Sequence, residues 1–299
     1  MVMKISLLTD EISADPETAI ELGVEWGVRD FELRGFYNDR VPRLSDYQRH
    51  HLGQVLNEHQ ARIIAVGPGL FKIPNPPKHP PRTNLGWLDH IEYGHWSEAQ
   101  RLVRYHLDEL LPASLEYARE FGAQLVVIFG FDRAGAPPGD PPEQVLDCLW
   151  QAAEQAKALE VQLVLENEAG FWADTGRRTA RMVRVINHPA LSVNWDPGNA
   201  FFAGDDPYPT GYEEVRGLVR HVHFKDARRD RNGEAQFVAE GQIDWERQVQ
   251  ALAADGFNGY LSIETHIRPK VAAARAALER LRALIANTME NGQHHHTKY

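Results

Sequence analysis

Four apolar stretches in the second half of the chain each end in a side chain that can bind a divalent metal ion. Each stretch is a short, β-branched run of the kind that forms a fully buried strand. The intervals between these ends are 30, 27 and 41 residues, about one strand–helix–strand unit each, and helical patterns fill the gaps. If the strands close into a barrel, three carboxylates and one imidazole converge, a set that suits Mn²⁺, Mg²⁺, Co²⁺ or Zn²⁺. The predicted ligands are Glu166, Asp196, His223 and Glu264.

Further polar residues follow the same strand ends. Alternate residues of a strand share a face, so Glu168 accompanies Glu166, and His266 accompanies Glu264. Lys225 follows the seventh strand directly and projects into the same mouth. We predict that Glu168, Lys225 and His266 contact the substrate, the last two as hydrogen-bond donors to its oxygens.

Three more residues are interpreted from their position in the strands. His221 faces the same way as His223 but lies one layer deeper, so we predict a buried, hydrogen-bonded histidine that supports the ligands. Glu32 and Arg34 flank Leu33 at the end of the second strand. This pair is read either as a salt bridge at the barrel rim or as a substrate contact, and Glu32 is placed among the substrate-binding candidates.

The elements that must position these residues alternate between strand and helix eight times. This pattern predicts an α/β protein with a single (β/α)₈ TIM barrel over residues 1–288, followed by a polar tail, 289–299, that we expect to be disordered. An open doubly wound sheet would need a glycine-rich turn after an early strand, and TDEISADPE contains no glycine. The predicted strands are 4–9, 29–35, 62–67, 123–131, 161–167, 191–197, 219–226 and 259–266.

Three long connections are expected to line the mouth at the C-terminal ends of the strands. They are 68–96, which is rich in proline and aromatic residues, 132–142 and 200–212. The first of them has two interpretations that the sequence leaves open: it covers the ligand, or it packs against a second subunit.

Composition limits the partners of the chain. Its 299 residues carry a formal net charge of −10, which argues against a nucleic-acid or anionic-membrane surface. The basic run 227–233 is interrupted by an aspartate and is typical of a solvated loop. Cys148 is the single cysteine, so neither an intrachain disulfide nor a cysteine-built metal site is expected. The longest apolar run, 125–129, is too short to span a bilayer, and we expect a cytoplasmic protein.

The ordered series DEIS, FELRG, LVLENE, VNWDPGN, HVHFKD, EGQIDW and GFNGYLSIETH resembles the xylose-isomerase-like TIM-barrel superfamily. This superfamily includes sugar phosphate isomerases and epimerases, among them ketose 3-epimerases, inosose dehydratases, hydroxypyruvate isomerases and endonuclease IV. The resemblance covers nearly the whole chain. It implies the same four metal ligands that the spacing predicts. Relatives in this superfamily are often dimers or tetramers, so the resemblance also allows a homo-oligomer.

By resemblance to the ketose epimerases, Glu166 and Glu264 would be the pair that transfers the proton, and Arg229 would bind the substrate. The chain departs from those epimerases where a histidine three residues after the strand-six aspartate is replaced by Asn199, which we keep among the substrate-binding candidates. The extra histidines of the trinuclear zinc site of endonuclease IV are absent from strands three and four, which end AVGP and IFGF.

The sequence therefore predicts a metal-dependent isomerase or epimerase of carbohydrate metabolism. Its substrate would be a small sugar or related polyhydroxy carbonyl compound, which reacts through an enediolate by carboxylate-mediated proton transfer. The alternative is a lyase, a dehydratase of inosose or keto-sugar type, which shares the first step. A third interpretation is a catalytically inert sugar-binding barrel, against which the four intact ligand positions stand.

Overall fold

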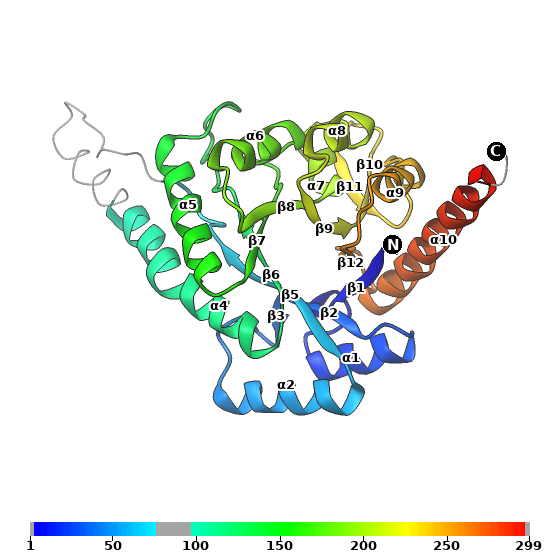
Figure 1. Cartoon of the computed structure of the whole chain (residues 1–299), viewed down its shortest axis with the longest axis horizontal. Coiled ribbons are helices and arrows are strands. Elements are labelled where there is room, and N and C mark those ends of the chain that lie inside the picture. Colours follow the sequence, from blue (N-terminus) through cyan, green and yellow to red (C-terminus); the bar gives the residue numbers. More distant parts are fainter. Residues whose placement is uncertain (1–2, 76–96, 297–299) are drawn as a thin grey trace.

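Apolar runs form eight strands, and neighbouring strands pair in parallel until the sheet closes on itself (Figure 1). The computed structural model describes residues 3–75 and 97–296. Strands adjacent in the barrel are also adjacent along the chain, which confirms the predicted (β/α)₈ fold. The barrel strands are β1 (Lys4–Leu8), β2 (Asp30–Leu33), β5 (Arg62–Leu70), β6 (Leu125–Phe129), β7 (Gln162–Glu166), β8 (Leu191–Trp195), β9 (Val219–Phe224) and β12 (Tyr260–Ile263).

The register of the strands places their C-terminal ends at one level. Phe129 of β6 pairs with Glu166 of β7, and Glu166 pairs in turn with Asn194 of β8. On the other side of the site, Ser262 of β12 lies beside His223 of β9. Because these ends meet at one rim, side chains that follow them converge on the mouth of the barrel.

Helices cover the outside of the barrel, and several begin at a capping side chain. The Ser45 hydroxyl accepts from the Gln48 amide, and the Gln48 side chain accepts from the Ser45 amide in return, which closes a capping box. Residues 97–105 are helical and continue into the turn η2 (His106–Leu110) and α4. The helices are α1 (Pro16–Glu25), α2 (Asp46–His59), α4 (Leu111–Glu120), α5 (Glu143–Ala158), α6 (Gly176–Ile186), α7 (Pro197–Phe202), α8 (Tyr212–Val215), α9 (Trp245–Ala254) and α10 (Lys270–His296), with short turns η1 (Thr9–Glu11) and η3 (Pro207–Gly211).

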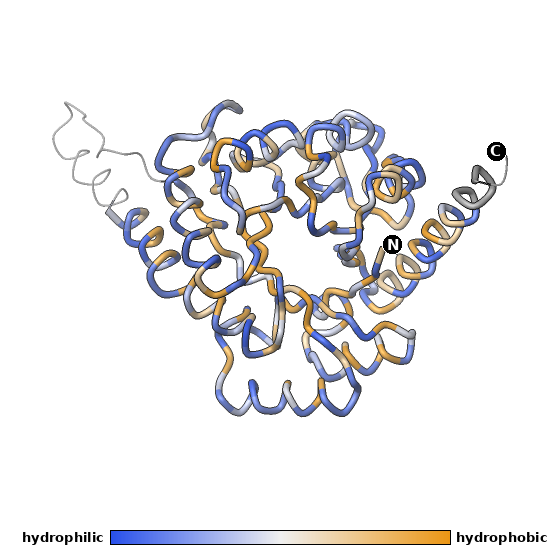
Figure 2. Tube along the Cα trace, viewed as in Figure 1, coloured by the Kyte–Doolittle hydropathy of each residue, from blue (hydrophilic) through white to orange (hydrophobic). Residues whose placement is uncertain are grey.

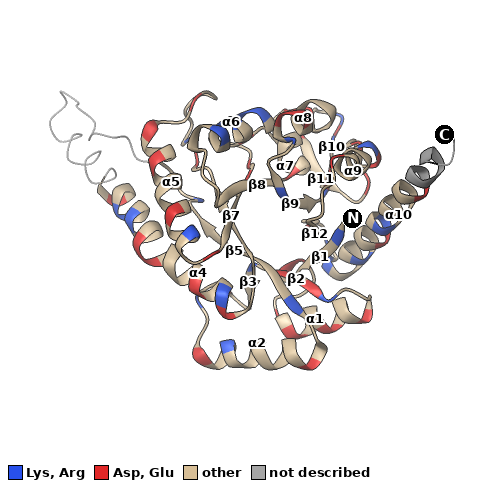
Figure 3. Cartoon of the chain, viewed as in Figure 1, with Lys and Arg blue, Asp and Glu red and all other residues tan. Residues whose placement is uncertain are grey.

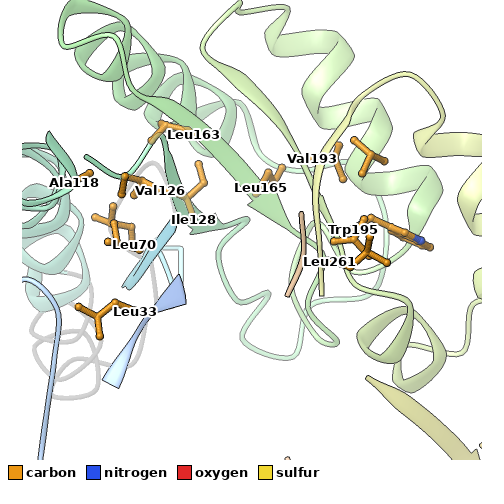
Figure 4. Packing of buried hydrophobic residues seen from close by; sticks show 14 of the residues in the cluster. Leu33, Leu70, Ala118, Val126, Ile128, Leu163, Leu165, Val193, Trp195 and Leu261 are labelled. Atoms are coloured by element: carbon orange, nitrogen blue, oxygen red, sulfur yellow. The ribbon is translucent and has the colours of Figure 1, made fainter. Parts of the chain in front are cut away.

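The main hydrophobic core lies between the strands and this ring of helices. Alternation along β7 puts Leu163 and Leu165 in that core, together with Val193 and Trp195 of β8 (Figure 4). Val164 instead joins a small separate cluster inside the barrel. Figure 2 shows hydrophobic segments along the strands and the inward sides of the helices, and Figure 3 shows charges of both signs along the outer helices. The inward face of each strand is therefore free to carry polar side chains toward the mouth.

Two small antiparallel hairpins follow barrel strands on the mouth side. The first pairs β3 (Gly35–Phe36) with β4 (Asp39–Arg40) after β2, and the second pairs β10 (Asp226–Arg229) with β11 (Ala235–Val238) after β9. The sequence analysis did not identify either hairpin, because two to four residues are too few to show a strand pattern.

The predicted connections and tail differ from the observed elements in places. Residues 200–212 are mostly helical, in α7, η3 and α8, because Asp196 and Asp206 cap two short turns there. Residues 76–96, most of the predicted 68–96 loop, lie outside the described residues, so its two interpretations stay open. Helix α10 continues to His296, past the predicted start of the tail at residue 289.

None of the helices in the described ranges combines the length and the hydropathy that crossing a membrane requires.

His106 gives a prediction about acid stability. Its buried ring accepts a hydrogen bond at Nδ1 from the Phe71 amide, at 2.8 Å, and burial, with a smaller effect of Arg43, lowers the pKa of His106 to about 4. The folded protein thus favours neutral His106, whereas the unfolded chain protonates near pH 6.5. As the pH falls from 6.5 to 4, the unfolded state binds more protons, and we expect a loss of about 3 kcal/mol in unfolding free energy.

Urea unfolding of the wild type and His106→Gln between pH 7.5 and 4 measures this effect. The variant is expected to lose less stability over that range, because glutamine cannot become protonated. Parallel pH profiles for the two proteins would contradict the assignment.

Candidate metal and substrate site

The four predicted ligands meet at the mouth of the barrel. Glu166 ends β7, Asp196 follows β8, His223 lies near the end of β9, and Glu264 follows β12. Each offers one atom, and these atoms all lie within 4.8 Å of one another. All four side chains are buried, with at most 4% of their surface exposed. The chain thus brings together residues that are separated by up to 98 positions in the sequence.

His223 lies at the centre of the cluster. Its Nδ1 is 3.2 Å from Glu264 Oε2, 3.5 Å from Glu166 Oε1 and 3.7 Å from Asp196 Oδ2. Burial alone would lower the pKa of His223, but the surrounding carboxylates, above all Glu32, raise it well above its usual range.

The donor set fits one divalent cation. Bonds of roughly 2.0–2.6 Å to such an ion keep its ligand atoms no more than about 5 Å apart, which the cluster satisfies. Asp196 Oδ2 is buried and accepts no hydrogen bond within the described part of the chain, although the Lys225 ammonium lies 2.8 Å away. An ion bound here would share that oxygen with the ammonium. Three carboxylates and one imidazole suit Mn²⁺, Mg²⁺, Co²⁺ or Zn²⁺, and they do not distinguish among these metals.

Glu32 and His221 lie behind His223. The Glu32 carboxylate is 2.8 Å from His221 Nε2 and 3.2 Å from His223 Nε2, and only 1% of Glu32 is exposed. Burial would raise the pKa of Glu32, but the two histidines hold it well below its usual range. With Nε2 turned toward Glu32, the opposite nitrogen of His223 faces the other carboxylates. Glu32 also lines the pocket, but both of its oxygens are occupied by histidines, so its contacts favour orienting His223.

Glu264 is surrounded by cations. Lys225 Nζ lies 2.7 Å from one oxygen, His266 Nε2 lies 3.3 Å from the other, and Arg34 also pairs with it. Burial would raise the pKa of Glu264, but Lys225, Arg34 and His223 together lower it well below its usual range. Glu11, which the sequence analysis did not assign, holds this arrangement through Arg34 and His266.

Glu166 has mainly neutral donors. The Asn199 side-chain amide donates to Glu166 Oε1 at 3.0 Å and to the Asn167 carbonyl at 3.0 Å. The Asn199 backbone amide donates to Oδ1 of Asp196, the N-cap of α7, at 2.8 Å. Asn194 donates to the other Glu166 oxygen at 3.4 Å. Asn199 therefore orients two of the ligand carboxylates in addition to lining the pocket.

The cluster opens into a pocket of about 210 Å³, below the range of about 300–1,000 Å³ that is typical of drug-sized ligands, so it suits a small metabolite. Burial raises the pKa of Glu168, and Glu166 adds to that effect, although Lys72 lies 2.9 Å from its carboxylate. The pocket is lined by the predicted residues Glu32, Glu166, Glu168, Asn199, His223, Lys225, Glu264 and His266, and by Arg34, Arg40, Lys72, Val127, Phe129, Phe202 and Phe237.

Arg229 is the predicted substrate-binding residue that the structure does not bring to the pocket lining. Its guanidinium donates to the Gly233 and Phe201 carbonyls, and its side chain is exposed. The hairpin β10–β11 holds it there, because its backbone pairs with Ala235. A role for Arg229 in substrate binding stays a prediction.

Two pocket residues, Arg40 and Lys72, and one residue that contacts the ligands, Asn194, had no signal in the sequence. Arg40 and Lys72 lie in connections that show no periodic pattern, and Asn194 lies within a strand where its inward direction depends on register. The sequence analysis assigned candidates from the ends of predicted strands, so it could find only residues at or directly after those ends.

A larger hollow of about 940 Å³ lies at the other end of the barrel, against the N-terminal ends of the strands. Its lining includes Lys4, Arg62 and Arg220. In TIM barrels the C-terminal rim carries the chemistry and the N-terminal rim contributes to stability, and the ligand cluster lies at the C-terminal rim.

Comparisons with known proteins agree with this fold. Residues 20–284 match the model of a family described as xylose isomerase-like TIM barrel. The solved structures of an L-ribulose 3-epimerase (TM-score 0.69, 16% identity, 98% of this chain and 97% of that one) and of an IOLI protein with a bound zinc atom (TM-score 0.69, 17% identity, 96% and 99%) share the fold.

Among curated proteins, an inosose dehydratase of Lacticaseibacillus casei is 22% identical over 146 residues, which is 44% of this chain and 49% of that protein. The rhizopine catabolism protein MocC of Rhizobium meliloti is 26% identical over 140 residues, 42% of each chain. The chain thus spans about half the length of these curated relatives in the matched regions.

The Glu32–His223 contact predicts an effect on metal affinity. Glu32→Gln removes the charge that orients His223, and we expect Mn²⁺ to bind about 10–100-fold more weakly, as for carboxylates that support metal-ligating histidines elsewhere. Isothermal titration of the folded protein with Mn²⁺ measures this. Glu17→Gln is the matched control, because Glu17 contacts His51 at 3.0 Å on the surface, away from the ligands. Equal affinities in wild type and Glu32→Gln would contradict the orienting role.

Proposed function

Since the chain belongs to the xylose isomerase-like TIM barrel family, we propose that it is a divalent-metal-dependent isomerase or epimerase. Its substrate is a sugar or related polyhydroxylated carbonyl compound, and the reaction begins with removal of the proton on the carbon beside the carbonyl. The observation that carries the proposal is the buried cluster of four ligand atoms within 4.8 Å of one another at the mouth of the barrel. The share of sequence that the curated relatives match is too small to transfer their activities, so the proposal rests on this geometry.

Glu166, Asp196, His223 and Glu264 would hold the ion, which supplies Lewis-acid polarisation of a carbonyl oxygen. Lys225 and His266 line the same pocket with N–H groups that can donate to substrate oxygens. Phe129, Phe202 and Phe237 form an apolar part of the lining, which limits the access of water to the reacting carbon.

The two glutamates that would transfer the proton have different surroundings. Glu264 contacts three cationic side chains, so it gains little by taking up a proton. Glu166 contacts mainly neutral amides, and Glu168 lies beside it in the same pocket. Glu166, with Glu168 as its neighbour, is therefore the better acceptor. The same carboxyl group can return the proton to the neighbouring carbon, which gives isomerisation, or a donor on the opposite side can return it, which gives epimerisation.

A lyase is the second candidate, and two observations favour it. Lys225 and His266 lie on the Glu264 side of the site, where they can donate a proton to a leaving hydroxyl group. The electron pair left by the departing proton then forms the carbon–carbon double bond as the hydroxyl leaves as water. Most of the matching curated relatives carry the name inosose dehydratase.

Proton exchange tests the shared first step. Incubation in D₂O with Mn²⁺ and a panel of ketoses, aldoses and inososes is expected to place deuterium at one carbon of a reactive compound. Chelation by EDTA should abolish exchange, and Glu166→Gln should slow it by about 10²–10⁴-fold, because it removes the proton acceptor. Asp140→Asn serves as control, since Asp140 lies exposed in the 132–142 loop and pairs with Arg181 of α6, away from the pocket lining.

The products then separate the two candidates. An isomer of unchanged mass indicates an isomerase or epimerase, and loss of one water indicates a dehydratase. Exchange that persists in EDTA, or that Glu166→Gln leaves intact, would contradict the proposed mechanism. Absence of Mn²⁺ binding would contradict the metal site itself.

A further inference from the structure

Cations of the pocket are almost all neutralised by carboxylates. Lys225 pairs with Glu264 at 2.7 Å, and Lys72 pairs with Glu168 at 2.9 Å. His266 and Arg34 both pair with Glu11 and Glu264. These four side chains therefore have little remaining capacity to bind an anion. Apart from the predicted ligand His223, the cationic residues in the lining are Arg34, Arg40, Lys72, Lys225 and His266.

Arg40 differs from the other four. Its guanidinium makes one hydrogen bond, from Nε to the Gly67 carbonyl at 2.7 Å, and forms no ion pair with a carboxylate in the described ranges. The two terminal nitrogens, Nη1 and Nη2, are left to donate. A partly buried guanidinium with no direct ion pair is unfavourable, so this arrangement favours a partner beyond those that residues 3–75 and 97–296 supply.

The backbone fixes Arg40 in this place. Arg40 pairs with Gly35 in the hairpin β3–β4, which the fully buried Phe36 anchors to the core. The side chain then lies against β5, where a Cβ on Gly69 would come within 3.2 Å of Nη1. Gly69 also has a φ of +79°, a conformation that other residues rarely adopt. The glycine allows the close approach, and the hydrogen bond to Gly67 sets the direction of the guanidinium.

We propose that the substrate carries an anionic group, a carboxylate or a phosphate, and that Arg40 binds it through Nη1 and Nη2. This inference rests on the proposed function and narrows its substrate class from neutral sugars and cyclitols to sugar acids or sugar phosphates. A planar guanidinium matches two oxygens of either group, which gives orientation as well as affinity. Binding at Arg40 would leave the carbonyl end of the substrate for the four ligand residues.

The electrostatic surroundings of Arg40 favour binding of an anionic group. Burial, with a smaller effect of the nearby Arg34, lowers the pKa of Arg40, and the carboxylates of Asp10, Glu166 and Glu264 offset only part of that shift. On balance the surroundings of Arg40 disfavour the cation. An oxyanion beside Nη1 and Nη2 would raise the pKa of Arg40 and stabilise its charged form. A neutral sugar would leave the guanidinium with hydroxyl acceptors only, which bind a cation more weakly than a charged oxygen does.

The first test compares substrates that differ only in terminal charge. Ketoses of four to six carbons are offered in three forms, with a terminal hydroxymethyl, carboxylate or phosphate group, and deuterium exchange is followed with Mn²⁺. At least one anionic form is expected to exceed its neutral counterpart about 100-fold in kcat/KM. Arg40→Gln should remove that preference, because it lowers kcat/KM of the anionic form far more than that of the neutral form. Arg43→Gln, three residues on, exposed and outside the pocket lining, should keep it.

The second test does not depend on catalysis. Ribitol, ribonate and ribitol 5-phosphate have no carbonyl, so they bind without reacting. Titration into the Mn²⁺-loaded protein is expected to show at least about tenfold tighter binding of one anion than of ribitol, and Arg40→Gln should abolish the difference. Comparison of ribonate with ribitol 5-phosphate identifies the group that Arg40 prefers.

The outcomes test the role of Arg40 and the proposed reaction separately. Equal kcat/KM for neutral and anionic forms, or an equal fall for both in Arg40→Gln, would overturn the role of Arg40 and leave the proposed function standing. If no compound exchanges but binding of an anion depends on Arg40, the anion site stands and the proposed reaction fails. If neither anion binds more tightly than ribitol, the inference is wrong.

Discussion

Burial of negative charge at the mouth of the barrel is the constraint on which the site depends. Four carboxylates, those of Glu32, Glu166, Asp196 and Glu264, have at most 4% of their surface exposed. Ionised carboxylates away from water are strongly destabilising unless cations or hydrogen-bond donors compensate them. The surrounding cations and amides supply part of that compensation, and a divalent ion among the same oxygens would supply more. The chemistry of the site and the stability of this end of the barrel therefore depend on the same charges.

The buried carboxylates are not compensated equally, so the two sides of the site differ in their electrostatic surroundings. Cations gather around Glu264, whereas amides contact Glu166. A carboxylate among cations stays ionised, while one among neutral donors can exchange a proton more readily. In the proposed mechanism, the Glu166 side of the site would accept a proton and the Glu264 side would donate one. Isomerases and dehydratases differ in where the second proton goes, and both reactions can use this asymmetry.

The sequence predicts the barrel and the ligand cluster because both follow from periodicity. Strand ends recur at regular intervals, alternation assigns each ligand to the inward face, and closure brings them together, as Glu166 and Glu264 illustrate. The pairing among side chains could not be predicted in this way. Glu32 was assigned to substrate, yet its oxygens contact His221 and His223, because the register of β2 against its neighbours sets its depth. No sequence pattern indicated Arg40, since its position depends on a hairpin of two-residue strands and on the space beside Gly69.

In the proposed anion site, the residues that select a substrate lie outside the periodic pattern. The strand-end ligands are fixed by the fold and suit any molecule with a carbonyl and a neighbouring hydroxyl group. Arg40 and Lys72 come from connections, whose length and sequence can change without altering the barrel. Lys72 is already paired with Glu168, but the two terminal nitrogens of Arg40 make no hydrogen bond or ion pair within residues 3–75 and 97–296. In the proposed function, the catalytic step is thus set by residues that the barrel positions, and the charge of the substrate is set by a residue that a hairpin adds. This division explains how one barrel architecture can keep a single first step while accepting different substrates.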